Sequence, residues 1–176
     1  MKNPKSLYNG RPDKNMKLLP REILGNFLLC VVVNFENKNN NITICSDPAG
    51  GDGILQDKKS GKTWETEHVM TKINGGEKQE AETLIIESIE AKKKKGIQYA
   101  ANKRLIVFLE GGKKWFPNKL AKLIKPPLFF HSVWIFSLCK APEKSFTYNI
   151  VQINNESLIW RVEINEGFSS WKVVRV

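Results

Sequence analysis

Residues 52–67 have the sequence Asp-Gly-Ile-Leu-Gln-Asp-Lys-Lys-Ser-Gly-Lys-Thr-Trp-Glu-Thr-Glu, and this stretch decides the fold that we predict. The segment Lys58-Lys59-Ser60-Gly61 is typical of a hairpin turn, and the residues on either side of it have strand character. We therefore expect a β-hairpin with strands over residues 52–57 and 62–71.

The position of the turn determines which residues of the two strands face each other. With the loop centred between residues 59 and 60, Asp52 faces Glu67 and Ile54 faces Glu65. Residues directly opposite each other, and alternate residues of one strand, point to the same side of a sheet. Asp52, Glu65 and Glu67 are thus expected on one face, with Glu65 diagonal to Asp52 at ~7–8 Å between backbones.

Three carboxylates on one face repel one another unless a cation lies between them. Oxygen ligands select hard ions such as Mg²⁺ or Mn²⁺. In a basic protein, this pattern indicates metal-dependent attack of water on a phosphodiester. The alternative is that Glu65 and Glu67 form the solvent-facing side of an amphipathic strand.

Outside the hairpin, helices and strands follow one another along the chain. Apolar spacing predicts a helix from near Pro20, a strand over residues 41–45 and a long helix over residues 77–100. The apolar run 104–110 is typical of a buried strand. A short helix (118–125) and strands over 131–139, 148–153, 157–164 and 170–176 complete the pattern. The expected fold class is α/β, or mixed α+β.

Composition limits the classes of protein that the sequence can represent. The 176 residues suit one domain, and 41% hydrophobic residues are enough for a folded core. No run is long enough to span a membrane, and the first residues do not resemble a signal peptide, so we expect a cytoplasmic protein. Lys and Arg outnumber Asp and Glu by 28 to 18, and this net charge of +10 favours a polyanionic partner.

The order helix, acidic hairpin, long helix and strand resembles the core of the PD-(D/E)XK nuclease superfamily. The resemblance covers residues 20–110, with Gly51-Asp52-Gly53 as the acidic strand and Glu65-Thr66-Glu67 as the second motif. It implies one nuclease-like domain over residues 1–176, with an irregular basic arm (1–16), a restriction-endonuclease-like core and a C-terminal extension (111–176).

The resemblance also implies roles for individual residues. Asp52 and Glu65 would be metal ligands, together with the Thr66 carbonyl, and the cofactor would be Mg²⁺ or Mn²⁺. Glu67 occupies the position of the usual lysine, where it would help to bind the metal or position the attacking water. Charge stabilisation would then require a second metal ion or a lysine from elsewhere in the chain.

Some neighbouring residues have two interpretations. Glu22 on the first helix could point toward the site, although a solvated position is the favoured interpretation. His68 alternates away from Glu67 and is expected to pack or hydrogen-bond behind the hairpin, in preference to acting as a base. The run Lys92–Lys95 either contacts a phosphate backbone or complements the helix dipole.

A second basic stretch contains aromatic residues, Trp115 and Phe116, among its lysines. Such a stretch is typical of a nucleic-acid contact. The lysines that we expect to bind DNA are Lys113, Lys114, Lys119 and Lys122.

Three functions are compatible with these features. The first is a metal-dependent DNA endonuclease of restriction or repair type, which could be a homodimer. The second is a non-catalytic nucleic-acid-binding module on a degenerate nuclease fold. The third is a protein-interaction module whose basic surface matches an acidic partner.

Overall fold

The computed structural model describes residues 18–47, 49–71, 79–109, 114–140, 145–153, 157–165 and 167–176. The expected basic arm, residues 1–16, lies outside the described residues. The helices and strands follow in this order: α2 (Pro20–Glu36), β1 (Ile42–Cys45), β2 (Ile54–Asp57), β3 (Thr63–Met70), α3 (Ala81–Lys93), α4 (Ile97–Ala100), β4 (Arg104–Leu109), α5 (Pro117–Leu123), β5 (Ser132–Lys140), β6 (Ser145–Ile153), β7 (Leu158–Asn165) and β8 (Trp171–Arg175).

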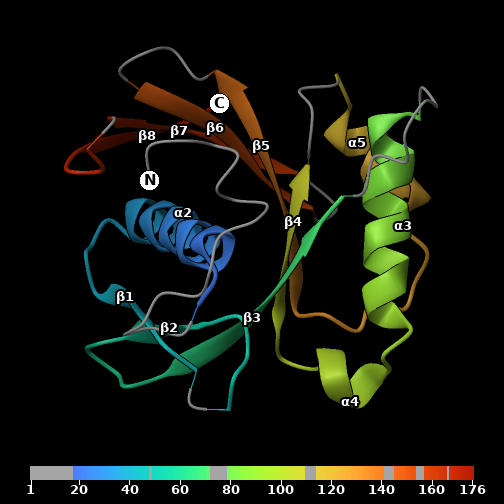
Figure 1. The fold of residues 1–176 in the computed structure, drawn as a ribbon, viewed down its shortest axis with the longest axis horizontal. Helices are drawn as coiled ribbons and strands as arrows, with labels where there is room; N and C mark the ends of the chain where they lie inside the picture. Colours follow the sequence, from blue (N-terminus) through green and yellow to red (C-terminus); the bar gives the residue numbers. More distant parts are fainter. Residues whose placement is uncertain are drawn as a thin grey trace.

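The strands form one eight-stranded sheet in which spatial order follows chain order. Strands β3, β4 and β5 are parallel, and every other neighbouring pair is antiparallel. The sheet curls around α2, whereas α3 and α5 cover its opposite face along β4 (Figure 1). The expected mixed α and β class is therefore confirmed.

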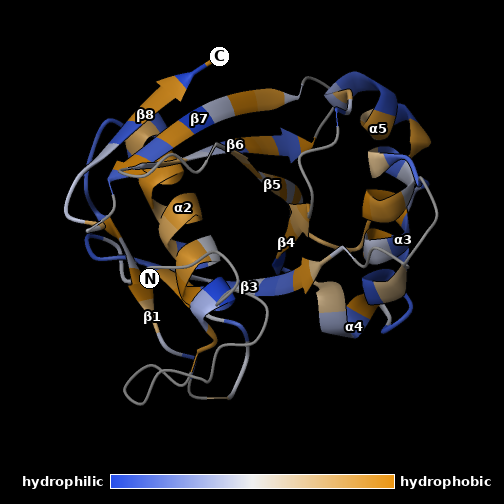
Figure 2. Ribbon diagram, turned by 45° about the horizontal axis from the view of Figure 1, so that its top comes forward, coloured by the Kyte–Doolittle hydropathy of each residue, from blue (hydrophilic) through white to orange (hydrophobic). Residues whose placement is uncertain are grey.

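Each face of the sheet has its own apolar core. Helix α2 is apolar over most of its surface (Figure 2), and this composition suits its position inside the curled sheet. The α2 core includes Leu28, Leu29, Val32, Ile106 and Trp160. The α3 core includes Ile85, Ile89, Val107, Leu120 and Ile135.

The long helix expected over residues 77–100 is shorter in the structure. Residues 77 and 78 lie outside the described residues, and α3 begins at Ala81. Gly96 has a φ of 93°, a left-handed conformation that an α-helix cannot continue through, so α4 is a separate turn. This break turns the chain toward β4.

The hairpin register is confirmed: Ile54 pairs with Glu65 and Gln56 pairs with Thr63. Strand β3 then changes partner along its length. Its first part pairs with β2, and its residues from Thr66 onward pair with β4. Since β2 begins at Ile54, the edge of β3 beyond Glu65 faces the segment that precedes β2. Asp52 lies in this segment. None of the described helices has the length and apolar composition needed to cross a membrane.

Candidate active site

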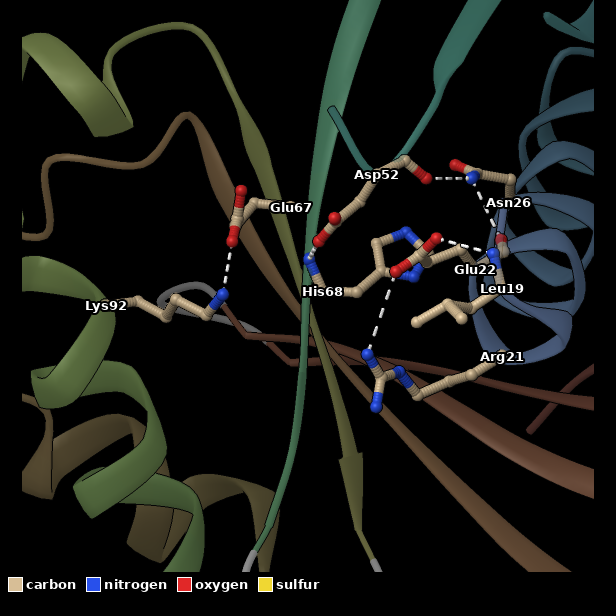
Figure 3. Close-up of polar contacts among 8 residues, drawn as sticks. All are labelled: Leu19, Arg21, Glu22, Asn26, Asp52, Glu67, His68 and Lys92. Carbon is tan, nitrogen blue, oxygen red and sulfur yellow. Dashed lines mark hydrogen bonds and ion pairs between the residues drawn. The ribbon is translucent and has the colours of Figure 1, made fainter. Parts of the chain in front are cut away.

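Asp52 is fixed against the edge of β3 by two hydrogen bonds. The backbone N–H of His68 donates to its Oδ2 at 2.6 Å, and its backbone carbonyl accepts from Nδ2 of Asn26 at 2.8 Å (Figure 3). Asp52 therefore lies in line with β2, although the strand itself begins at Ile54. Burial raises the pKa of Asp52 to about 6, and the carboxylates of Glu67 and Glu22 add to the increase.

Glu67 is the acid that the register places opposite Asp52. It is buried, and its carboxylate accepts a hydrogen bond from Nζ of Lys92, which reaches it from α3 (Figure 3). The Tyr99 side chain of α4 also lies close enough to Glu67 for the two groups to interact. Burial and this contact with Glu67 raise the pKa of Tyr99 above its usual range. One strand position thus joins a carboxylate, an ammonium group and a phenol.

Glu22 contributes a further carboxylate from the first turn of α2. It is buried, Oε2 accepts a hydrogen bond from the Leu19 backbone N–H at 2.7 Å, and Oε1 lies 3.8 Å from Nη2 of Arg21. The solvated position that we favoured for Glu22 is therefore wrong. The helix end is held against Asp52, close enough for the two charges to interact.

Asn26 links α2 to β3 and to the segment that precedes β2. It is fully buried, and Nδ2 donates to the Glu22 carbonyl at 2.9 Å as well as to the Asp52 carbonyl. Its Oδ1 accepts from Oγ1 of Thr66 at 2.7 Å. This approach requires glycine at position 53, because a Cβ there would lie 2.2 Å from Nδ2 of Asn26 and Gly53 has a φ of 133°.

His68 packs behind the hairpin, as expected. Its ring lies against Phe108 on the α2 side of the sheet, and a Cβ at Gly25 would lie 2.7 Å from its Cε1. Burial lowers the pKa of His68 to about 3, and the charges of Arg21 and Lys92 contribute. The imidazole is thus neutral near pH 7, and its described surroundings offer no hydrogen-bond partner to either ring nitrogen.

The expected convergence of three carboxylates on one ion is not found. The Glu65 side chain is 53% exposed and pairs with Lys103 at 3.0 Å. No group of three His, Cys, Asp or Glu side chains in the described ranges is arranged around a shared metal position. Thr66 is buried beside Asn26, and its backbone N–H donates to the Gly53 carbonyl at 3.0 Å. Asp52 and Glu67 come together, whereas Glu65 turns to a lysine.

Three oxygen groups near Asp52 are the ones that could hold a magnesium-like ion. Mg²⁺ keeps several waters and is commonly bound by one or two carboxylates together with substrate phosphate. Asp52 and Glu67 supply two carboxylates. The N–H and C=O of one strand residue point to the same edge, so the His68 carbonyl also faces the edge where its N–H meets Asp52.

The lysines expected to bind DNA lie elsewhere. Lys113 is outside the described residues. Lys119 pairs with Glu80 at 2.8 Å and with Glu82 at 3.6 Å, near the start of α3. Lys122 is exposed on α5, and Nζ of Lys114 lies 5.3 Å from the Phe116 ring centroid. This stretch is at the other end of α3 from Lys92 (Figure 1).

Lys92 and Asn26 are the residues whose roles the sequence analysis missed. Helical spacing contains a signal for each of them. Lys92 follows Ile85 by seven residues and Ile89 by three, and so lies half-buried along the edge of the buried stripe of α3. Asn26 lies between Glu22 and Leu29 on one stripe of α2. A polar residue in a buried stripe indicates a specific polar partner.

Comparisons with protein-family models, with curated proteins and with solved structures found no match.

Proposed function

We propose that this protein hydrolyses phosphodiester bonds of DNA with the help of Mg²⁺ or Mn²⁺. The observation that carries this proposal is the meeting of three groups at β3: Asp52 from the segment before β2, Glu67 from β3 and Lys92 from α3. Two acids and one lysine are the charged groups of a PD-(D/E)XK site. The net charge of +10 suits a polyanionic substrate.

The arrangement of elements supports the same proposal. Helix α2, the meander β1–β2–β3, helix α3 and the parallel strand β4 follow the order of a restriction-endonuclease-like core. In this assignment the second motif is Glu67-His68, in place of Glu65-Thr66. The cation missing from the strand comes from Lys92 of α3 instead.

Each residue then has a defined task. Asp52, Glu67 and the His68 carbonyl would hold the metal ion, which lowers the pKa of bound water and stabilises charge on phosphate oxygens when it is present. Lys92 would place positive charge beside the phosphate that is attacked. In the reaction, a water oxygen bonds to phosphorus as one ester P–O bond breaks, and the proton of the water passes to the departing oxygen.

The test is cutting of supercoiled, linear and branched DNA with Mg²⁺, with Mn²⁺ and with chelator. The informative comparison is Glu67→Gln against Glu65→Gln, because both acids lie on β3 and only Glu67 lies opposite Asp52. We expect metal-dependent cutting that is lost in Asp52→Asn and Glu67→Gln and kept in Glu65→Gln.

Other outcomes would point to different functions. Loss in Glu65→Gln with activity kept in Glu67→Gln would restore the assignment made from the sequence. Tight, salt-sensitive DNA binding without cutting would favour a non-catalytic binding module. Absence of both binding and cutting would overturn the proposal and favour a protein partner.

A further inference from the structure

We propose that the backbone of duplex DNA lies across a surface formed by Lys95, Tyr99 and Lys103, which we call the α4 surface. This inference rests on the proposed function, because it assigns the substrate contact of the same site. It also moves the expected DNA contact from the lysines around α5 to the opposite end of α3.

The α4 surface is directly connected to the candidate active site. Nζ of Lys103 lies 3.0 Å from Oε2 of Glu65, two residues before Glu67 on β3, and Tyr99 is close enough to Glu67 for the two groups to interact. Nζ of Lys95 donates to the Tyr99 hydroxyl at 2.9 Å. A phosphate held by these lysines would therefore be next to the one beside Asp52 and Glu67.

The charge of this segment is unusually one-sided. Residues 91–109 contain six Lys and Arg residues and no Asp or Glu. Lys93 is buried and bonded to Glu90, and Lys92 contacts Glu67, so these two belong to the interior. Lys95 is exposed, and it contacts the uncharged Tyr99. Lys103 pairs with an exposed carboxylate, and such pairs contribute little, so phosphate can replace Glu65 at small cost.

Part of the positive charge near α5 is neutralised, and this part lies far from the candidate active site. Lys119 is neutralised by Glu80 and Glu82. Between Glu82 and Lys92, α3 extends ~15 Å at about 1.5 Å per residue. A DNA contact at Lys119, beside Glu82, would thus be distant from the acids that we propose to hold the reacting phosphate.

The position of Tyr99 favours a duplex over a single strand. Single-strand binding uses aromatic rings that are open for stacking by bases. Nζ of Lys95 lies 4.3 Å from the Tyr99 ring centroid and Nζ of Lys103 lies 5.1 Å from it, and the ring is partly buried. The two lysines occupy the position of a stacked base, so the surface presents ammonium groups to a phosphate backbone.

The test is the affinity of a short labelled duplex as a function of salt, measured in chelator. All proteins carry Asp52→Asn, so that binding is measured without cutting. The double variant Lys95→Gln/Lys103→Gln is compared with Lys114→Gln/Lys122→Gln, which changes the net charge equally around α5 at two exposed lysines. Thermal unfolding of each protein verifies that it is folded.

We expect the α4 variant to bind about tenfold more weakly, with a salt slope smaller by about 2, since each lost phosphate contact removes about 1. We expect the α5 variant to resemble its parent. A larger loss in the α5 variant, equal losses in both, or no loss in either would overturn the inference, as would tighter binding of single strands by the parent. Loss of cutting alone would affect only the proposed function, since binding is measured without metal.

Discussion

The ammonium group of Lys92 contacts the carboxylate of Glu67 across the space between α3 and β3 (Figure 3). The contact crosses 25 positions of sequence and joins a helix to the second strand of the acidic hairpin. It supplies the positive charge that the hairpin itself does not contain near Asp52.

Replacing Lys92 by Met should reduce the rate of DNA cutting by about 100-fold or more, the usual cost of removing one group that stabilises developing charge. Lys92→Arg should restore part of the rate, because it keeps the charge at a changed geometry. The rates are measured under single-turnover conditions, with Lys172→Met on exposed β8 as the control. Parent-like cutting by Lys92→Met would contradict the assignment.

Asn26 is predicted to be a positioning residue for Asp52. Asn26→Ala leaves buried partners without hydrogen bonds, which should reduce the free energy of unfolding by about 1–3 kcal/mol. It should also raise the Mg²⁺ concentration required for half-maximal cutting, because Asp52 is no longer held.

The control for Asn26 lies two turns along the same helix. Asn34 bonds the N–H and C=O of Ile42, each at 2.9 Å, far from Asp52. Asn34→Ala should therefore lower stability similarly without changing the metal requirement. If both variants change that requirement equally, Asn26 has only a structural role.

Gly53→Ala should destabilise the protein more than Gly61→Ala. Both glycines have positive φ, so alanine is strained at either position by roughly 1–3 kcal/mol. At Gly53 the new Cβ would also lie 2.2 Å from Nδ2 of Asn26, whereas at Gly61 nothing lies within 4 Å. Denaturant unfolding of the two variants measures the difference, and equal midpoints would show that the hairpin end adjusts freely.

Asp52→Asn should stabilise the metal-free protein above pH 6. The pKa of Asp52 is raised from 3.8 to about 6, mainly by burial. The folded protein therefore binds this proton more tightly than the unfolded chain does. The resulting stabilisation is complete below pH 4 and is lost as the pH rises through 6. The shift corresponds to ~3 kcal/mol at most, and partial solvation reduces it.

Unfolding in chelator at pH 4, 5, 6 and 7 tests the direction of this pH dependence. The advantage of Asp52→Asn over the parent should grow with pH and shrink when Mg²⁺ is added. Asp57→Asn is the control. Turn hydrogen bonds from Lys59 and Ser60 lower the pKa of Asp57, so the effect of this substitution on stability should change with pH in the opposite direction. An advantage that is constant with pH would contradict the origin assigned to the Asp52 shift.

The hairpin could be predicted in detail because its turn and alternation are local. The segment 58–61 sets the register, and the pairing of Ile54 with Glu65 followed from it. The choice between Glu65 and Glu67 was not local. It depends on Lys103, which is beside Glu65 only because β4 pairs with β3 in a parallel register of Thr66 with Arg104. Between β3 and β4 the chain passes through α3 and the break at Gly96, so this pairing joins residues far apart in the sequence.

The two carboxylates opposite each other are held from different sides of the sheet. Asn26 anchors Asp52 to α2, and Lys92 anchors Glu67 to α3. These helices pack against separate apolar cores. The two acids therefore keep their spacing only while α2 and α3 are both packed against the sheet. Loosening either helix disables the pair while the eight strands remain joined, so thermal inactivation should precede loss of the β-sheet signal.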